Sequence, residues 1–340
     1  MAHIKEVAEK AGVSISTVSR AISGKVLVDP ETKKRVFQAV QELNYQPNAL
    51  AKGLKEGSSK TIGLVIPNIR NLIFPAAIKG ITDVAKANGY TVVLCNTDDD
   101  PETEKFYTEN LRQRLVDGLI FSTATRESAP YIMNLKQTGY PVVLFLRGLP
   151  EAIDAVVVDN LKGGYDATRF LIQRGYRKIA LINGTLSLEL YRKRYSGYRA
   201  ALAIAGIPFD PELVIHETTG WEDGYRAFKE IRQRGCNPDA IFATSDPKAL
   251  GVIKALKEMN LRVPQDVAVM GYDNLELSEL MDPPLTTMAQ PFYEAGVKAA
   301  QRLVKLIHNK QGLQPELKLL EAELLVRQSV GFGNAFPKGN

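Results

Sequence analysis

The fold of the N-terminus is decided by residues 4–23, which read IKEVAEKAGVSISTVSRAIS. Apolar residues recur there at i, i+3 and i+4 in two blocks, a spacing that predicts two helices of about eight residues each. The two blocks are Ile4, Val7 and Ala8, and then Val18, Ala21 and Ile22. Gly12 can end the first helix because glycine tolerates a positive φ, and Ser14 can cap the second.

The second predicted helix has an exposed face of short hydroxyl side chains and one arginine. Such a face suits the major groove of DNA, where an arginine can bind guanine through two hydrogen bonds. An ordinary all-α domain with two solvated helices has the same pattern, so both interpretations are open at this point. The candidate DNA-contacting residues are Ser14, Ile15, Ser16, Thr17, Ser19 and Arg20.

A longer stretch resembles the DNA-binding headpiece of the lactose-repressor (LacI/GalR) family. The matching segments are residues 8–20 with the pattern AxxAGVSxSTVSR, residues 30–32 with Pro-Glu-Thr, and residues 43–51 with LNYQPNALA. The match has no gaps, and it continues over the chain to about residue 330. The resemblance implies a homodimeric repressor that binds a near-palindromic operator in double-stranded DNA and responds to a small-molecule effector.

Length and charge agree with a DNA-binding segment joined to further domains. The chain has 340 residues, which is enough for two or three domains. Residues 1–60 hold ten basic and six acidic residues, so most of the net charge of +5 lies in the first fifth of the sequence. No apolar leader opens the chain and no run of roughly eighteen apolar residues occurs. We therefore expect a cytoplasmic protein that does not bind a membrane.

A third helix and a linker follow the helix pair. Asp29 can cap the helix, and Pro30 suits its first position. Its apolar residues are expected to close the small core: Val36, Phe37, Val40 and Leu43. Residues 48–56 are too short a segment, and too weakened by glycine, to form a stable helix alone. They are either a flexible linker or a segment that becomes helical when a second copy and DNA pack against it.

The family resemblance favours the second alternative, because it implies a hinge helix in this segment. Leu54 matches a leucine that inserts between base pairs in the minor groove, where an apolar wedge kinks the duplex. Asn48 and Lys55 are the other DNA-contacting candidates of the segment.

From Thr61 onward, short apolar runs alternate with helical stretches, which predicts parallel sheets covered by helices on both faces. The runs form two series: residues 62–66, 91–95, 118–121, 142–146 and 155–158, and then 178–182, 240–243 and 267–270. The predicted fold class is α/β, with an all-α helix-turn-helix headpiece and hinge helix before a two-lobed core like that of periplasmic binding proteins. The predicted domains are 1–46 (headpiece), 47–60 (hinge helix and linker), 61–160 with 289–318 (first lobe), 161–288 with 319–331 (second lobe) and 332–340 (tail).

Ligands of open α/β sheets bind at the carboxyl ends of the strands. The candidates found there are Phe74, Arg147, Arg194, Trp221, Asp246 and Asp273. The resemblance implies that Arg194 holds polar oxygens of the effector, that Trp221 stacks on it, and that Asp273 accepts its hydroxyl groups. Each residue also has a structural alternative. Asp246 could cap the helix 247–259, Asp273 could order the loop that follows it, and Phe74 and Trp221 could belong to the core.

These patterns favour a repressor controlled by a metabolite, expected to be a sugar or a sugar derivative. A sugar-binding receptor of the same fold is the alternative, although the headpiece counts against it. A regulator that acts with a corepressor or a phosphocarrier protein is also possible. The sequence has no catalytic triad, phosphate-binding glycine loop or metal-ligand cluster, so we expect neither an enzyme nor a cofactor.

Overall fold

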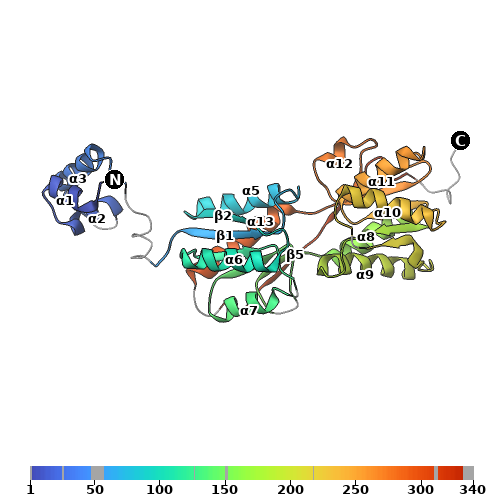
Figure 1. Cartoon of the computed structure of the whole chain (residues 1–340), viewed down its shortest axis with the longest axis horizontal. Coiled ribbons are helices and arrows are strands. Elements are labelled where there is room, and N and C mark those ends of the chain that lie inside the picture. The colour runs from blue at the N-terminus through green and yellow to red at the C-terminus, as the bar shows by residue number, and fades with distance from the viewer. Residues whose placement is uncertain are drawn as a thin grey trace. The chain divides into compact units, whose positions relative to one another are not determined.

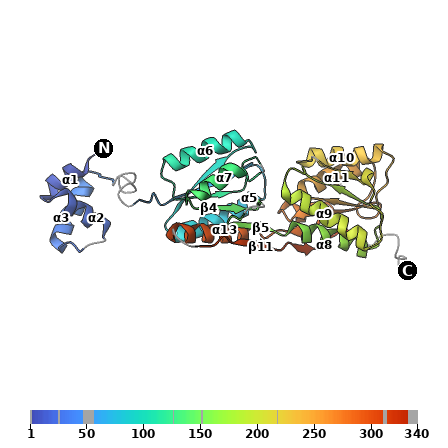
Figure 2. The same ribbon diagram turned by 90° about the horizontal axis from the view of Figure 1, so that it is seen from below.

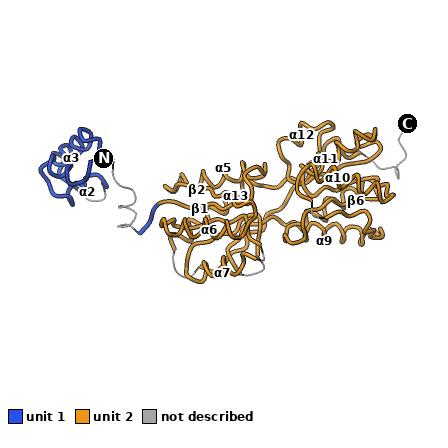
Figure 3. The backbone as a smooth tube through the Cα atoms, in the orientation of Figure 1, with its two compact units in different colours: residues 1–59 blue, residues 60–340 orange. Residues whose placement is uncertain are grey.

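A computed structural model describes residues 2–24, 27–46, 57–125, 127–149, 152–216, 218–309 and 313–331. The chain divides into two compact units, residues 1–59 and 60–340 (Figure 3). The predicted hinge residues Asn48, Leu54 and Lys55 lie outside the described residues. Within the described part of the chain, no helix is long and apolar enough to cross a membrane.

The N-terminal unit consists of three helices, labelled in Figure 1: α1 (Ile4–Ala11), α2 (Ile15–Ser23) and α3 (Pro30–Glu42). Gly12 ends α1 at a φ of 63°, as its position in the sequence predicts. Ser14 caps α2 by accepting a 3.2 Å hydrogen bond from the Thr17 amide, and Asp29 caps α3 in the same way. The helices enclose a small core of Val7, Ala8, Ala11, Val18, Ala21, Val36 and Ala39.

Phe37 does not belong to this core, contrary to the prediction. It is 43% exposed, while Val36 and Ala39 are buried and Val40 packs against them. Successive residues of a helix point about 100° apart, so the face that buries Val36 and Val40 turns Phe37 toward solvent. The small Ala39 completes the apolar face instead.

The first lobe contains a six-stranded sheet in the order β11-β5-β4-β3-β1-β2. Its strands are all parallel: β1 (Thr61–Ile66), β2 (Thr91–Asn96), β3 (Gly118–Phe121), β4 (Val142–Phe145), β5 (Ala155–Val158) and β11 (Leu317–Leu320). Helices α5 (Phe74–Ala87) and α13 (Phe292–His308) cover one face. Helices α6 (Pro101–Gln113) and α7 (Ala129–Gln137) cover the other, and Figure 2 shows α6 and α13 on opposite sides.

The second lobe contains another six-stranded sheet, in the order β12-β10-β9-β8-β6-β7. Its strands are β6 (Ile179–Ile182), β7 (Val214–Ile215), β8 (Ala240–Ala243), β9 (Ala268–Asp273), β10 (Thr286–Ala289) and β12 (Glu323–Leu325). They pair in parallel except for β10 and β12. Helices α8 (Asn160–Gln173) and α9 (Glu189–Ile204) cover one face, and α10 (Trp221–Gln233) and α11 (Asp246–Glu258) cover the other. The short helix α12 (Leu277–Leu280) lies between β9 and β10 in the sequence.

The chain passes between the lobes at three points in the described residues: after β5, between β10 and α13, and between β11 and β12. The predicted boundary at residue 318 falls inside β11, because Leu317–Leu320 pairs with Ala155–Val158 of the first sheet. The last crossing therefore lies at residues 321–322. Several crossings of this kind form a hinge about which two lobes can move as bodies.

Candidate DNA-binding surface and effector site

The amino end of α2 carries a cluster of hydroxyl groups. The Ser14 hydroxyl lies 2.7 Å from that of Ser16 and 2.9 Å from that of Thr17. This is the positive end of the helix dipole, where unpaired amides and hydroxyls can bind phosphate oxygens. Ile15 beside them is 43% exposed and can contact a thymine methyl group.

Arg20 lies further along α2 and is exposed, whereas Ser19 is partly buried. No carboxylate of a described residue lies within ion-pair distance of the Arg20 guanidinium, so its donors are available for a base edge or a phosphate. The predicted DNA-contacting residues thus extend from the amino end of α2 to its last turn, on a helix whose opposite face is buried.

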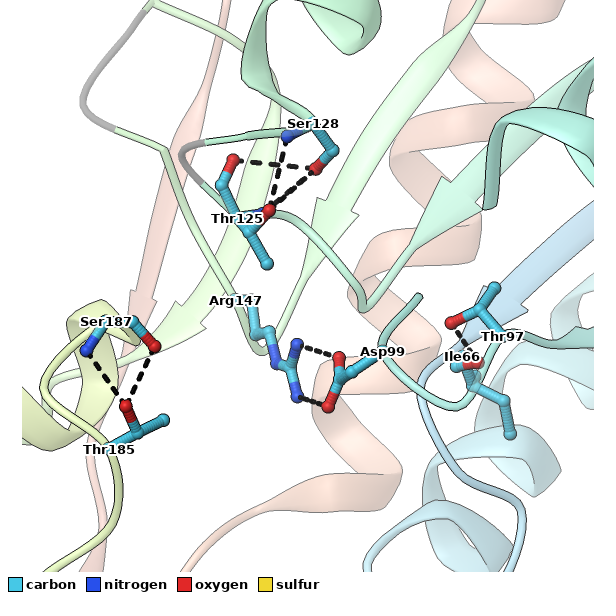
Figure 4. Close-up of polar contacts among 8 residues, drawn as sticks. All are labelled: Ile66, Thr97, Asp99, Thr125, Ser128, Arg147, Thr185 and Ser187. Atoms are coloured by element: carbon cyan, nitrogen blue, oxygen red, sulfur yellow. Dashed lines mark hydrogen bonds and ion pairs between the residues drawn. The ribbon is translucent and has the colours of Figure 1, made fainter. Parts of the chain in front are cut away.

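In the first lobe, Arg147 follows β4 and forms an ion pair with Asp99. Two nitrogens of its guanidinium donate to the two carboxylate oxygens at 2.5 and 3.0 Å (Figure 4). A two-point pair of this kind fixes both side chains. Figure 4 also shows two pairs of hydroxyl residues, Thr125 with Ser128 after β3 and Thr185 with Ser187 after β6. Polar groups therefore follow the strand ends of both sheets.

In the second lobe, Arg194 is buried on α9 and held on three sides. Its Nε donates to Asn160 Oδ1 at 2.7 Å, and its Nη1 donates to the Thr244 carbonyl at 2.5 Å. The guanidinium carbon lies 3.7 Å from the centre of the Tyr272 ring. These contacts are all with neutral groups, so the charge of Arg194 is fixed in position without being neutralised by them.

Asp273 lies at the end of β9 and has an unusual backbone conformation. Its φ is 119°, which side-chain-bearing residues rarely adopt and which proteins keep mainly at functional sites. Gln290 donates to its carboxyl group at 2.6 Å. Burial raises the pKa of Asp273 to about 7, although the nearby charge of Arg194 opposes the change. Arg194 and Asp273 thus form a buried donor and acceptor pair at the carboxyl edge of the second sheet.

Asp246 does not have the capping role that the sequence offers as its structural alternative. It is the first residue of α11, but Ser245 holds the cap position and the Asp246 carboxylate makes no capping bond. The carboxylate instead accepts from the Leu275 amide at 2.8 Å, the Ser278 hydroxyl at 2.5 Å and the Thr287 hydroxyl at 2.6 Å. These bonds tie the start of α11 to the segment after β9 and to β10, and contact of Asp246 with the effector stays a prediction.

Besides Arg147, which pairs with Asp99 in the first lobe, two predicted site residues have no contact with Arg194 or Asp273 among the described residues. Phe74 is buried in the core of the first lobe, which is the structural alternative named for it. Trp221 begins α10 and is 41% exposed, with the Lys254 ammonium 5.4 Å from its ring. No hydrogen bond or ring contact among the described residues joins Trp221 to Arg194 or Asp273.

Sequence reasoning missed three residues of the site: Asn160, Tyr191 and Lys248. Asn160 could have been found, because it follows β5 just as the chosen candidates follow other strands. Tyr191 lies three residues before Arg194 on the same helix, so both share a helical face. Nothing in the sequence marks Lys248 as a site residue, because a lysine in a helix is usually exposed to solvent.

Comparisons with known proteins identify the family of both parts of the chain. Residues 3–48 match the family described as bacterial regulatory proteins, lacI family. Residues 59–325 match periplasmic binding proteins and the sugar binding domain of the LacI family. The transcriptional regulator RegA of Clostridium saccharobutylicum is 37% identical over 96% of this chain and 98% of its own.

Two solved structures are similar to this chain over nearly its whole length. A lac repressor dimer bound to operator and the anti-inducer ONPF has a TM-score of 0.87 and 28% identity, with 96% of this chain and 98% of that chain covered. A complex of the regulator CelR with cellobiose has a TM-score of 0.75 and 32% identity, with 97% and 100% covered. These similar proteins are transcriptional regulators rather than enzymes.

Proposed function

This chain belongs to the LacI family of bacterial regulatory proteins, and we propose that it is a repressor whose operator affinity is set by a sugar or sugar derivative bound in its core unit. It is a DNA-binding transcriptional regulator that acts as a dimer on operator DNA, as the lac repressor dimer does. A twofold dimer presents two copies of α2, so its operator is near-palindromic.

The observation that carries the effector proposal is the buried pair of Arg194 and Asp273. Arg194 offers a fixed hydrogen-bond donor, and Asp273 offers an acceptor that can also be protonated. Tyr272 packs against the guanidinium from the core, and the partly exposed Tyr191 can cover the apolar surface of a sugar ring. A few polar groups among aromatic rings are typical of small-molecule sites. The sugar-binding description of the matching family and the cellobiose complex support this choice of ligand class.

We infer that binding rather than catalysis is the chemistry of this site. The groups that contact Arg194 are an amide, a carbonyl and phenol rings, and the similar proteins are transcriptional regulators rather than enzymes. The effector therefore acts by favouring one arrangement of the two lobes over another.

A thermal-shift screen of the full-length protein against neutral and acidic sugars tests the proposal. A ligand that raises the melting temperature is then added to an operator titration. We expect it to change operator affinity in the wild type and to have neither effect on Arg194→Ala. Lys257→Met, which changes an exposed residue of α11, is the control and is expected to behave as the wild type. An effector response that survives intact in Arg194→Ala would show that the effector binds elsewhere.

A further inference from the structure

Lys248 is a fully buried lysine in the first turn of α11. Its ammonium nitrogen lies 3.2 Å from the Ser245 hydroxyl and 3.4 Å from the Tyr191 hydroxyl. Among the described residues, no carboxylate lies within ion-pair distance of it. Buried ammonium groups are normally paired with an acid, because leaving water is costly for an isolated charge. The two hydroxyl contacts are neutral and one of them is long.

The position of Lys248 in its helix makes the charge harder to explain as structural. It lies three residues after the cap residue Ser245, at the amino end of a helix of thirteen residues. The helix dipole disfavours a cation there and favours an anion. The same turn also holds the Asp246 carboxylate, but within the described part of the chain Lys248 and Asp246 do not form an ion pair.

Lys248 and Arg194 both lie near one aromatic ring. The Lys248 ammonium is 4.6 Å from the centre of the Tyr191 ring, and the Arg194 guanidinium carbon is 5.6 Å from it. Tyr191 itself is partly exposed and packs over Gly184, where a side chain would collide with the ring. Two buried cations therefore approach the same ring at the carboxyl edge of the second sheet.

In the described part of the chain, none of the acids at this edge forms an ion pair with either cation. The Asp246 carboxylate accepts from Leu275 and Ser278, between β9 and β10, and from Thr287 in β10. Asp273 senses the charges of both Arg194 and Lys248, yet burial raises its pKa to about 7, so it is only partly ionised near neutrality. Asp159, which is partly buried, caps α8 through the Lys162 amide. Lys248 and Arg194 therefore make their direct hydrogen bonds to neutral groups only, and neither has an ion-pair partner among the described residues.

We propose that the effector carries an acidic group, a carboxylate or a phosphate, which binds to Lys248 and Arg194 around Tyr191. The effector is then a sugar acid or a sugar phosphate rather than a neutral sugar. The inference rests on the proposed function and specifies its ligand. The anion replaces the Tyr191 hydroxyl at the Lys248 ammonium, while Asp273 accepts hydroxyl groups from the remainder of the molecule.

The first test is the stability of the free full-length protein. Lys248→Met has a similar volume and lacks the charge, so we expect its melting temperature to exceed that of the wild type by a few degrees. A lower melting temperature would mean that the bonds of Lys248 to Ser245 and Tyr191 stabilise the fold, and the proposal would fail. Lys257→Met removes an exposed lysine of the same helix and controls for net charge.

The second test uses inorganic phosphate, glucuronate, glucose 6-phosphate and glucose as probes at constant ionic strength set with KCl. We expect phosphate and at least one acidic sugar to raise the melting temperature of the wild type and of Lys257→Met, but not of Lys248→Met. Glucuronate and glucose 6-phosphate distinguish a carboxylate from a phosphate. The acid that binds should lose about tenfold or more in affinity on Lys248→Met, measured by calorimetry.

Three outcomes overturn the inference: no increase with phosphate in the wild type, the same increase in Lys248→Met, or glucose binding as tightly as the acids. If glucose binds as tightly as the acids and also alters operator binding, the proposed function still holds. Only the proposal that the effector carries an acidic group then fails. If phosphate binds to the wild type but no sugar raises its melting temperature or alters its operator binding, the result would instead count against the proposed function.

Discussion

Arg20 is the residue through which α2 can read a base. Its side chain is exposed, and the described part of the chain offers no carboxylate partner for it, so replacing it removes DNA contacts without leaving a buried charge. We predict that Arg20→Ala lowers the affinity for the operator by about 1–3 kcal/mol and relaxes the preference at one base pair of each half-site.

Titrating Arg20→Ala against operators that carry every single-base change measures this preference. The matched control is Arg35→Ala on α3, an exposed arginine that lies outside α2. A preference that is unchanged at every base pair would exclude Arg20 as a base-reading residue.

Asp273 gives the free protein a specific pH dependence. Its pKa is about 7 in the folded protein and near 3.8 in the unfolded chain, because burial disfavours the ionised form. The folded state therefore binds the proton more tightly, and the resulting stabilisation is complete below about pH 4 and is lost as the pH rises through 7.

We predict that the melting temperature of the wild type, relative to Asp273→Asn, falls between pH 5 and pH 7 and then becomes constant. Asparagine has nearly the same shape and does not titrate, so the difference between the two proteins isolates this one group. Scanning calorimetry in matched buffers measures it. A difference that is flat over this range would mean that Asp273 is ionised throughout.

Individual residues of the second lobe show which parts of a site a sequence can predict and which it cannot. Arg194 and Asp273 were found because family resemblance and strand ends point to the same positions. Lys248 was not found, because its burial arises from tertiary packing. Helix α10 lies so close to α11 that a Cβ atom at Gly224 would collide with the backbone of Lys248. The three bonds of Asp246 come from residues 29 to 41 positions away, and local patterns carry no information on such contacts.

At the scale of elements, Asp246 connects α11 to the segment between β9 and β10. We predict that Asp246→Ala destabilises the protein by about 1–3 kcal/mol or more, because it leaves the Leu275 amide and two hydroxyl groups buried without an acceptor. The loss should appear in the absence of any effector, as a lower midpoint of urea unfolding.

Asp246→Asn serves as the comparison, since its amide oxygen can still accept part of these bonds. A variant of either kind with wild-type stability and reduced effector affinity would instead assign Asp246 to direct ligand contact.

The sequence predicts a helix or strand best when its pattern of apolar residues extends over many positions. The helix at residues 292–308 has apolar residues at helical spacing over seventeen positions, and α13 has those limits. Strands β7 and β12 span two and three residues, which is too short for any periodicity, and the sequence did not predict them. Phe37 is the opposite case, an apolar residue that lies beside the buried face of α3 rather than on it.

At the scale of the whole core unit, the crossing between β10 and α13 links the effector site to the first lobe. Gln290 lies in this crossing, and its amide donates to Asp273 at 2.6 Å. Two residues further on, α13 begins, and it packs against α5 of the first lobe. A ligand that engages the Asp273 carboxyl group therefore acts on a side chain that belongs to the connection between the lobes.

Coupling between effector and operator requires that the effector bind one lobe arrangement more tightly than the other, and its size is typically about 1–3 kcal/mol. If Gln290 transmits part of it, then Gln290→Ala should retain effector affinity within about threefold. The ratio of operator affinities with and without effector should fall toward one. Linkage requires the effector affinity, measured with and without operator, to change by the same ratio. A variant that keeps the full ratio in both measurements would show that the lobes communicate through the other two crossings, after β5 and after β11.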